Sequence, residues 1–308
     1  MATETGFPPP GDVRRLLYMY GTVTQIELKN FLEFNSVDSD LQKREIKASW
    51  AAAAKHFEEL GRTERGMPDT IATRPLSEEN SRRAGSLRCD PLFDHTFSDY
   101  PYSFEEVELD KLVACQRAVH LEYISQLISE YECRGRDLLD YCLTPGRDTT
   151  PVNVGRTAPN AFTASSDNPG LRFLGAYEQP YRQELLEAQT PGGQPVRMIA
   201  LVLGYPCSTM NVYRVGNRII LGNGFHRLYA LRQMGVTHAP AVVQHITHPQ
   251  LELPPQMAEL PRDYLVENPR PALLKDFFNK QLTCEIRQRG FLKAVQVGWG
   301  VNDSMVPR

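Results

Sequence analysis

Residues 212–243 have the sequence VYRVGNRIILGNGFHRLYALRQMGVTHAPAVV, and this stretch decides the fold expected for the chain. Gly216 and Asn217 predict a two-residue hairpin turn, because both tolerate the backbone angles that such turns need. The apolar run 219–221 predicts a buried strand that ends at glycine. Apolar residues at helical spacing then predict a helix, and residues 239–243 predict a returning strand. The order strand, turn, strand, helix, strand indicates a small sheet with one helix packed on it.

The turn at residues 222–224 lies where the predicted helix begins. A helix start has unpaired backbone N–H groups and the positive end of the helix dipole. Glycine lets a phosphate approach those N–H groups closely, and arginine adds a planar fork of donors. Gly224, His226 and Arg227 therefore form a candidate phosphate-binding turn. The alternative interpretation is that Asn223 caps the helix and Arg227 is a solvated surface residue.

Two segments of the chain resemble one superfamily. Residues 224–235, GFHRLYALRQMG, resemble the signature segment of the ParB/sulfiredoxin-like superfamily, where Gly-x-(His or Arg)-Arg opens a helix that ends in Leu-Gly or Met-Gly. Residues 107–117, VELDKLVACQR, followed by residues 122–128, EYISQLI, are similar to the first ParB motif. The resemblance covers about residues 104–132 and 196–246. It implies the fold of this superfamily and nucleotide binding.

The known branches of the superfamily use groups that this chain lacks. Phe225 stands where sulfiredoxins have their nucleophilic cysteine and where ParB partition proteins have a glutamate. Free-serine kinases of this fold have Asp-Gly-His-His-Arg, whereas residues 223–227 are Asn-Gly-Phe-His-Arg. Those kinases also carry a glutamate in the first motif, and residues 115–117 offer none in register. We therefore expect the phosphate site without sulfiredoxin activity, with Phe225 packed as a wall or floor of the turn, and the branch stays open.

The motifs and the resemblance together predict an α+β fold. The expected core is a ParB/sulfiredoxin-like small mixed sheet with packed helices, an N-terminal helical extension and a long middle insertion. The expected parts are residues 1–103, a helical segment and loop; residues 104–246, the ParB/sulfiredoxin-like domain with an insertion at about 134–195; and residues 247–308, a C-terminal extension.

The expected function is that of a nucleotide-binding protein acting as a phosphotransferase or nucleotide hydrolase on a small molecule. A non-enzymatic, nucleotide-gated ParB-like module or a DNA-associated protein is the alternative. His226 would orient or protonate a phosphate oxygen, and Arg227 would neutralise developing charge. The resemblance implies a nucleoside di- or triphosphate, ATP or CTP, with Mg²⁺. The predicted cofactor-binding residues are Gln116, Arg117, Gly222, Asn223, Gly224, Phe225, His226 and Arg227.

Two features of the middle and end of the chain bear on the partners. The insertion either closes over the nucleotide and supplies Arg147, Arg156 or Arg172, or is structural decoration. Where a partition protein continues into a helix-turn-helix reader, this chain has a proline-studded run followed by a short helix at 272–278 and a strand at 294–301. We therefore expect a small-molecule substrate and no nucleic-acid partner, and a homodimer stays open.

Composition excludes several classes of protein. The chain has 308 residues and a net charge of −3, so no basic field indicates nucleic-acid binding. The six cysteines are far apart and no Cys/His cluster has metal-site spacing, so we expect free thiols and no metal ligands. The sequence shows no membrane-spanning stretch and no signal peptide, and we expect a cytoplasmic protein without a membrane partner.

The first hundred residues predict helices followed by a loop. Apolar residues suggest a helical segment at 12–34, and residues 39–60 predict a better amphipathic helix. The two would form a helical hairpin, which is either a packing element or a small DNA-reading module. Residues 62–102 have little periodicity, and we expect a long loop there.

Overall fold

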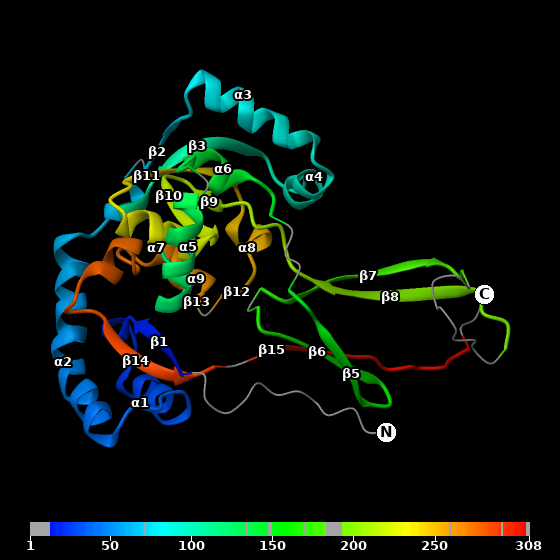
Figure 1. Ribbon diagram of the computed structural model, residues 1–308, viewed down its shortest axis with the longest axis horizontal. Helices are drawn as coiled ribbons and strands as arrows, with labels where there is room; N and C mark the ends of the chain where they lie inside the picture. Colours follow the sequence, from blue (N-terminus) through cyan, green and yellow to red (C-terminus); the bar gives the residue numbers. More distant parts are fainter. Residues whose placement is uncertain are drawn as a thin grey trace. The chain divides into compact units, whose positions relative to one another are not determined.

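The computed structural model describes residues 13–70, 72–133, 135–146, 150–168, 170–182, 193–258, 260–290 and 292–305 (Figure 1). The chain is a mixed α+β protein with several small sheets, which confirms the predicted fold class. It divides into a larger compact unit, residues 8–146 and 207–290, and a smaller one, residues 1–7, 147–206 and 291–308.

The larger unit is built around a five-stranded sheet with the strand order β10-β9-β11-β3-β2. Neighbouring strands are antiparallel except for β9 and β11, which are parallel. Val215 pairs with Arg218 across the predicted hairpin turn, and Gly216 has the positive φ of 60° that favours glycine. The helix α7, Phe225–Gln233, connects β10 to β11 as predicted. The strands are β2 (Thr73–Pro75), β3 (Tyr102–Glu108), β9 (Asn211–Val215), β10 (Arg218–Asn223) and β11 (His238–Ile246).

A second sheet of the larger unit joins segments from three parts of the chain. β1, Val13–Tyr18, lies between β14, Cys284–Arg289, and β4, Ala118–His120, and is antiparallel to both. The prediction of one helical segment at 12–34 was therefore wrong in its first part. Pairing on both sides satisfies the main-chain groups of β1, and this outweighs local helix propensity. The second part is helical: α1, Gln25–Phe34, begins with a capping box formed by Thr24 and Glu27.

The predicted second helix is confirmed and extends further than predicted. α2, Asp40–Thr63, begins after Ser39, which forms a capping box with Gln42. Trp50 Nε1 donates a hydrogen bond of 2.9 Å to the Val23 carbonyl and fixes α2 against the segment before α1. The buried side chains of α1 and α2 pack on the β1 sheet, which favours the packing interpretation of this helical pair.

Residues 62–102 are not the predicted loop. They contain two helices that polar side chains cap: Ser77 accepts from the Asn80 N–H before α3, and Asp90 accepts from the first turn of α4. Phe93 and Phe97 of α4 are buried against Tyr102 and belong to the main core. The prediction failed because turn-forming residues here serve as caps. The elements are η2 (Met67–Asp69), α3 (Glu78–Ser86), η3 (Leu87–Cys89) and α4 (Pro91–Phe97).

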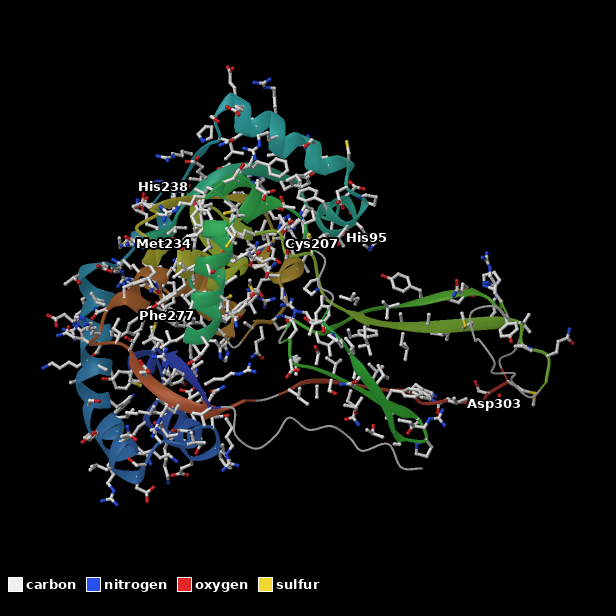
Figure 2. The ribbon with its side chains drawn as sticks, viewed as in Figure 1. His95, Cys207, Met234, His238, Phe277 and Asp303 are labelled. Atoms are coloured by element: carbon white, nitrogen blue, oxygen red, sulfur yellow. The ribbon has the colours of Figure 1, made fainter. Side chains whose placement is uncertain are left out.

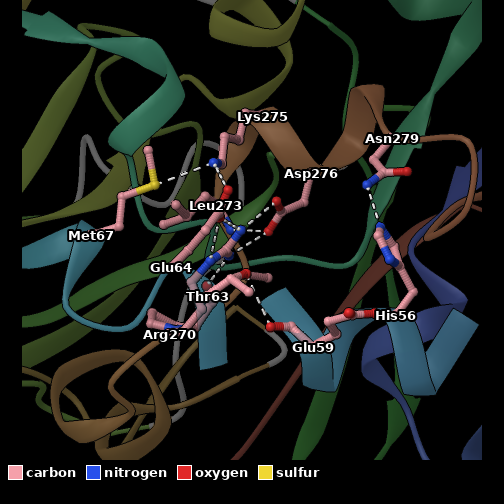
Figure 3. Close-up of polar contacts among 12 residues, drawn as sticks. His56, Glu59, Thr63, Glu64, Met67, Arg270, Leu273, Lys275, Asp276 and Asn279 are labelled. Carbon is pink, nitrogen blue, oxygen red and sulfur yellow. Dashed lines mark hydrogen bonds and ion pairs between the residues drawn. The ribbon is translucent and has the colours of Figure 1, made fainter. Parts of the chain in front are cut away.

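A buried ion cluster attaches the end of α2 to residues 270–276 (Figure 3). Arg270 is almost fully buried and lies 2.7 Å from the Asp276 carboxylate and 2.6 Å from the Glu64 carboxylate. Lys275 Nζ lies 2.7 Å from the second oxygen of Glu64. Such a buried arginine needs its partners, because removing one leaves an uncompensated charge. Residues 260–290, which contain part of this cluster, belong to the larger unit.

The remaining elements of the larger unit are short, apart from the helix of the first motif. That helix is α5, Leu121–Cys133, and it packs on α7. The predicted helix at 272–278 is the 3₁₀ segment η6, Leu274–Phe278. The others are η1 (Tyr20–Thr22), η4 (Leu109–Lys111), α6 (Leu138–Leu143), α8 (Pro249–Glu252), β12 (Gln256–Met257), β13 (Leu260–Pro261) and α9 (Arg262–Glu267).

The smaller unit consists of two thin sheets. One has the order β15-β6-β5, and the other is a two-stranded ribbon of β7 and β8. The predicted terminal strand is confirmed as β15, and its pairing with β6 joins the end of the chain to the middle insertion. Of the predicted insertion, residues 135–146 belong to the larger unit and the later described residues belong to the smaller one. The strands are β5 (Asn153–Ala158), β6 (Ala161–Ser166), β7 (Arg172–Pro180), β8 (Arg197–Gly204) and β15 (Lys293–Gly298).

Candidate functional site

The structure brings the two sequence motifs together. The Val113 N–H donates to the Ile219 carbonyl, and the Leu221 N–H donates to the Val113 carbonyl, at 3.0 and 3.1 Å. After this contact the first motif continues into α5, and the second continues into α7. The His120 N–H then donates a 3.3 Å hydrogen bond to the ring nitrogen Nε2 of His226. The two motifs thus meet at the start of α7, although they are far apart in the sequence.

The start of α7 has an unusual shape. Gly224 has a φ of 96°, and a Cβ at this position would lie 2.6 Å from Met210 Cγ, so only glycine fits. In the described part of the chain, the residue before the helix makes no side-chain cap and the first turn contains no acidic residue. Asn223 instead donates to the carbonyls of Cys207 and Thr209, at 3.1 and 3.2 Å. The interpretation of Asn223 as a helix cap was therefore wrong.

Arg227 is anchored to main-chain carbonyls rather than solvated. Its Nη1 donates to the Tyr141 carbonyl at 3.1 Å, and its Nη2 donates to the Ser208 carbonyl. Among the residues that the structure describes, no carboxylate forms an ion pair with Arg227. Burial lowers the pKa of the guanidinium. The alternative interpretation of a solvated surface arginine was wrong, because the side chain is half-buried and bonded to two carbonyls.

His226 is a neutral imidazole at this turn. Burial, followed by the neighbouring His120, lowers the pKa of His226 to about 3. The ring stacks on His120 at 5.6 Å and meets the edge of Tyr123 at 5.5 Å. Because Nε2 accepts the His120 N–H, the ring hydrogen resides on Nδ1. The expectation that His226 protonates a phosphate oxygen does not fit this environment, but a hydrogen bond from Nδ1–H does.

Phe225 packs into the core, as its predicted role as a wall or floor requires. It is 5 % exposed and meets Phe277 edge-to-face at 5.1 Å. Gly222 packs so closely on Asn211 and Tyr213 that a Cβ at this position would lie 2.8 Å from both side chains. Phe225 and Gly222 thus shape the turn, and neither residue provides a reactive group.

Gln116 and Arg117 face a different part of the larger unit. Gln116 Nε2 donates to the Ala118 carbonyl at 2.8 Å, and Arg117 Nη1 pairs with Glu27 at 3.1 Å. Arg117 Nε is buried and has no hydrogen-bond partner within the described residues. Arg117 and Arg227 thus hold separate partners, and the part of Gln116 and Arg117 in cofactor binding stays a prediction.

The insertion arginines lie in the smaller unit. Arg156 lies over the Phe162 ring at 5.2 Å, and Arg172 begins β7 as an exposed residue. Arg147 lies outside the described residues. Their contribution to the phosphate site stays a prediction.

Sequence reasoning missed several residues that build the turn. Of these, His120 and Tyr123 carried a local signal, since they lie at the start of the helix of the first motif. The others are Tyr141 in α6 and two residues of the loop before β9, and they touch the turn through main-chain carbonyls or packing. The missed residues are His120, Tyr123, Tyr141, Ser208 and Met210.

Other candidate chemistry is weak in the described residues. The six cysteines are free, and burial raises the pKa of the Cys142 thiol, beside Arg227, to about 12. No group of three or more His, Cys, Asp or Glu side chains there has the geometry to hold a metal ion. No helix among these residues is long and apolar enough to cross a membrane. An open cavity of about 490 Å³ is lined by Thr73, Arg74, Glu105 and Arg214, none of them a predicted site residue.

Comparison with protein-family models, curated proteins and solved structures gave no match for this chain. The resemblance to the ParB/sulfiredoxin-like superfamily therefore rests on the two motifs alone and stays a prediction. The geometry of the α7 start is the independent ground for a functional proposal.

Proposed function

We propose that this protein binds a nucleotide, ATP or CTP, and holds its phosphate against the start of α7. One observation carries the proposal: the first turn of α7 has no capping side chain and no acidic residue, and the anchored Arg227 beside it forms no ion pair in the described chain. The helix dipole and the guanidinium together favour an anion there. A phosphate would compensate Arg227 for the hydration that its guanidinium loses on burial.

Each group of the turn has a defined part in this proposal. The backbone N–H groups of residues 225–227 would face the phosphate oxygens. Arg227 has five N–H donors and uses two on carbonyls, so donors remain for the ligand. The Nδ1–H of His226 would add one neutral donor. Mg²⁺ enters with the nucleotide, through phosphate oxygens.

The titratable groups at the turn favour binding over acid–base catalysis. General acids and bases work best with a pKa near the operating pH. The pKa of His226 lies at about 3 and that of Cys142 at about 12. A nucleotide-gated binding module is therefore the first candidate. A phosphotransferase or nucleotide hydrolase is the second, because the positive turn supplies the charge stabilisation on which phosphoryl transfer depends.

A thermal-shift screen with ATP, ADP, CTP and GTP, each with Mg²⁺, tests the proposal. Ligand at 100 times its Kd stabilises a folded protein by about 2.7 kcal/mol, so a true ligand raises Tm clearly. His226→Glu places a carboxylate in the first turn, where it stabilises the helix but repels phosphate. His226→Gln is the matched neutral control. We expect the shift in the wild type and in His226→Gln and its loss in His226→Glu. Equal shifts in both variants, or no shift in the wild type, would contradict the proposal.

A further inference from the structure

The smaller unit buries very little of its chain. Only four of its described residues are buried, namely Ala161, Ala164, Ser166 and Leu171. Folding must offset the loss of conformational entropy with buried apolar surface, and three small residues and one leucine supply little of it. The β7–β8 ribbon also lacks buried apolar surface, and a lone two-stranded hairpin is only marginally stable in water.

The apolar side chains of the β7–β8 ribbon are exposed rather than buried in a core (Figure 2). Large apolar residues on and beside both strands are exposed, including Ile199 at 70 % and Tyr177 at 50 %. An exposed apolar patch of this kind marks an interaction surface. The exposed large apolar residues are Phe173, Leu174, Tyr177, Val196, Ile199, Leu201 and Val202.

The two edges of the ribbon differ in how they are protected. β7 has a register shift between Phe173 and Gly175, contains Glu178 and ends with Pro180. Bulges, charges and proline are the usual protection of an edge strand against pairing with another chain. β8 has none of these from 198 to 203, where its sequence is MIALVL. Among the described residues β8 pairs only with β7, so its outer edge is free to accept a strand (Figure 1).

We propose that the outer edge of β8 pairs with β8 of a second copy of this chain, in antiparallel orientation about a two-fold axis. Identical strands suit this contact because residues 198–203 carry no charge that would face a like charge across the axis. The resulting sheet, β7-β8-β8-β7, would have a protected β7 strand at each end, so assembly would stop at the dimer. The two apolar faces would also become continuous across the axis. This interface is independent of nucleotide binding at α7.

Light scattering during size-exclusion chromatography of the full chain tests the interface. We expect a dimer for the wild type. Leu201→Lys should weaken the dimer about 100-fold, because each copy loses one buried leucine and the two ammonium groups face each other near the axis. The control is Ala176→Lys, which lies opposite Leu201 on β7 and on the same face of the ribbon. It should leave the dimer nearly unchanged if the strands pair by their edges. Equal loss in both variants would instead indicate face-to-face packing and overturn the proposal, as would a monomeric wild type.

Disulfide trapping keeps the test decisive if Leu201→Lys fails to fold. Each residue from 198 to 203 is replaced in turn by cysteine, in a background where the exposed Cys89 and Cys133 are serine. Two copies of a residue on the axis lie close enough for a disulfide, whereas residues two positions away are about 13 Å apart. We expect rapid cross-linking at one central residue with a fall on either side, and none for Ala176→Cys. Uniform cross-linking along β8, or equal cross-linking from β7, would overturn the proposal.

Discussion

Replacing Arg227 with alanine should destabilise the larger unit strongly. The guanidinium donates to the carbonyls of Tyr141 and Ser208, and so attaches α6 and the loop before β9 to the first turn of α7. A hydrogen bond from a charged donor contributes about 1.5–3 kcal/mol, and the loss of two leaves half-buried carbonyls without a partner. We expect a loss of about 3 kcal/mol in the free energy of unfolding, since the site is partly hydrated.

Arg232→Ala is the matched control, because it makes the same change on the same helix. Arg232 pairs with Asp110 at 2.6 Å, but its side chain is 30 % exposed. A pair of this kind contributes about 1 kcal/mol or less. Urea unfolding followed by tryptophan fluorescence would report on the larger unit alone in a Trp299→Phe background, since the other tryptophan, Trp50, lies in α2. Equal losses for Arg227→Ala and Arg232→Ala, both below 1 kcal/mol, would refute the anchoring role of Arg227.

The remaining predictions concern the same turn. His226, with a pKa of about 3 in the fold, takes up protons more readily when the chain is unfolded, so it lowers stability as pH falls from about 6.5 towards 3. We expect His226→Gln to lose about 2 kcal/mol less than the wild type between pH 7 and pH 5 in urea titrations, and parallel curves would speak against a neutral buried ring. Gly224→Ala should cost about 2–3 kcal/mol, because the left-handed φ and the contact with Met210 add, whereas Gly235→Ala, also at positive φ but in open space, should cost about 1 kcal/mol. In a Met210→Ala background, Gly224→Ala should cost less than it does in the wild type. Equal costs at the two glycines would contradict the close approach of Met210 to Gly224. Wild-type protein mixed with sulfinylated peroxiredoxin and ATP should leave the sulfinate intact, because Phe225 provides no thiol; measurable reduction would overturn that prediction.

Local sequence signals were sufficient where an element depends on neighbouring residues. The hairpin at Gly216 follows from turn chemistry, and α2 follows from its apolar face and its cap at Ser39. β1 could not be predicted in this way, because its partners β4 and β14 come from distant parts of the chain. Its sequence, Val-Arg-Arg-Leu-Leu-Tyr, has no strict alternation, and pairing on both sides decides its conformation.

The candidate site likewise combines features set by neighbouring residues with features set by distant ones. Gly224 and Phe225 were predicted as a turn and a packing residue, since the motif itself sets both roles. The anchoring of Arg227 was not predictable, because its partners are the main-chain carbonyls of residues 141 and 208. Every residue has such a carbonyl, so the sequence does not indicate which of them an arginine will bind. The low pKa of His226 likewise arises from burial and from the neighbouring His120. Side-chain identity thus marked the turn, and tertiary packing determined what its groups can do.

The most direct test of the central claim is an amide ¹H–¹⁵N spectrum of the protein titrated with the Mg²⁺-nucleotide that gives the largest thermal shift. If the phosphate binds at the start of α7, the amide signals of residues 225–227 should move first and furthest, with downfield proton shifts from new N–H hydrogen bonds. The same titration of His226→Glu should leave them in place. Shifts confined to the cavity at Arg74 and Arg214, or an unchanged spectrum at saturating nucleotide, would contradict the account.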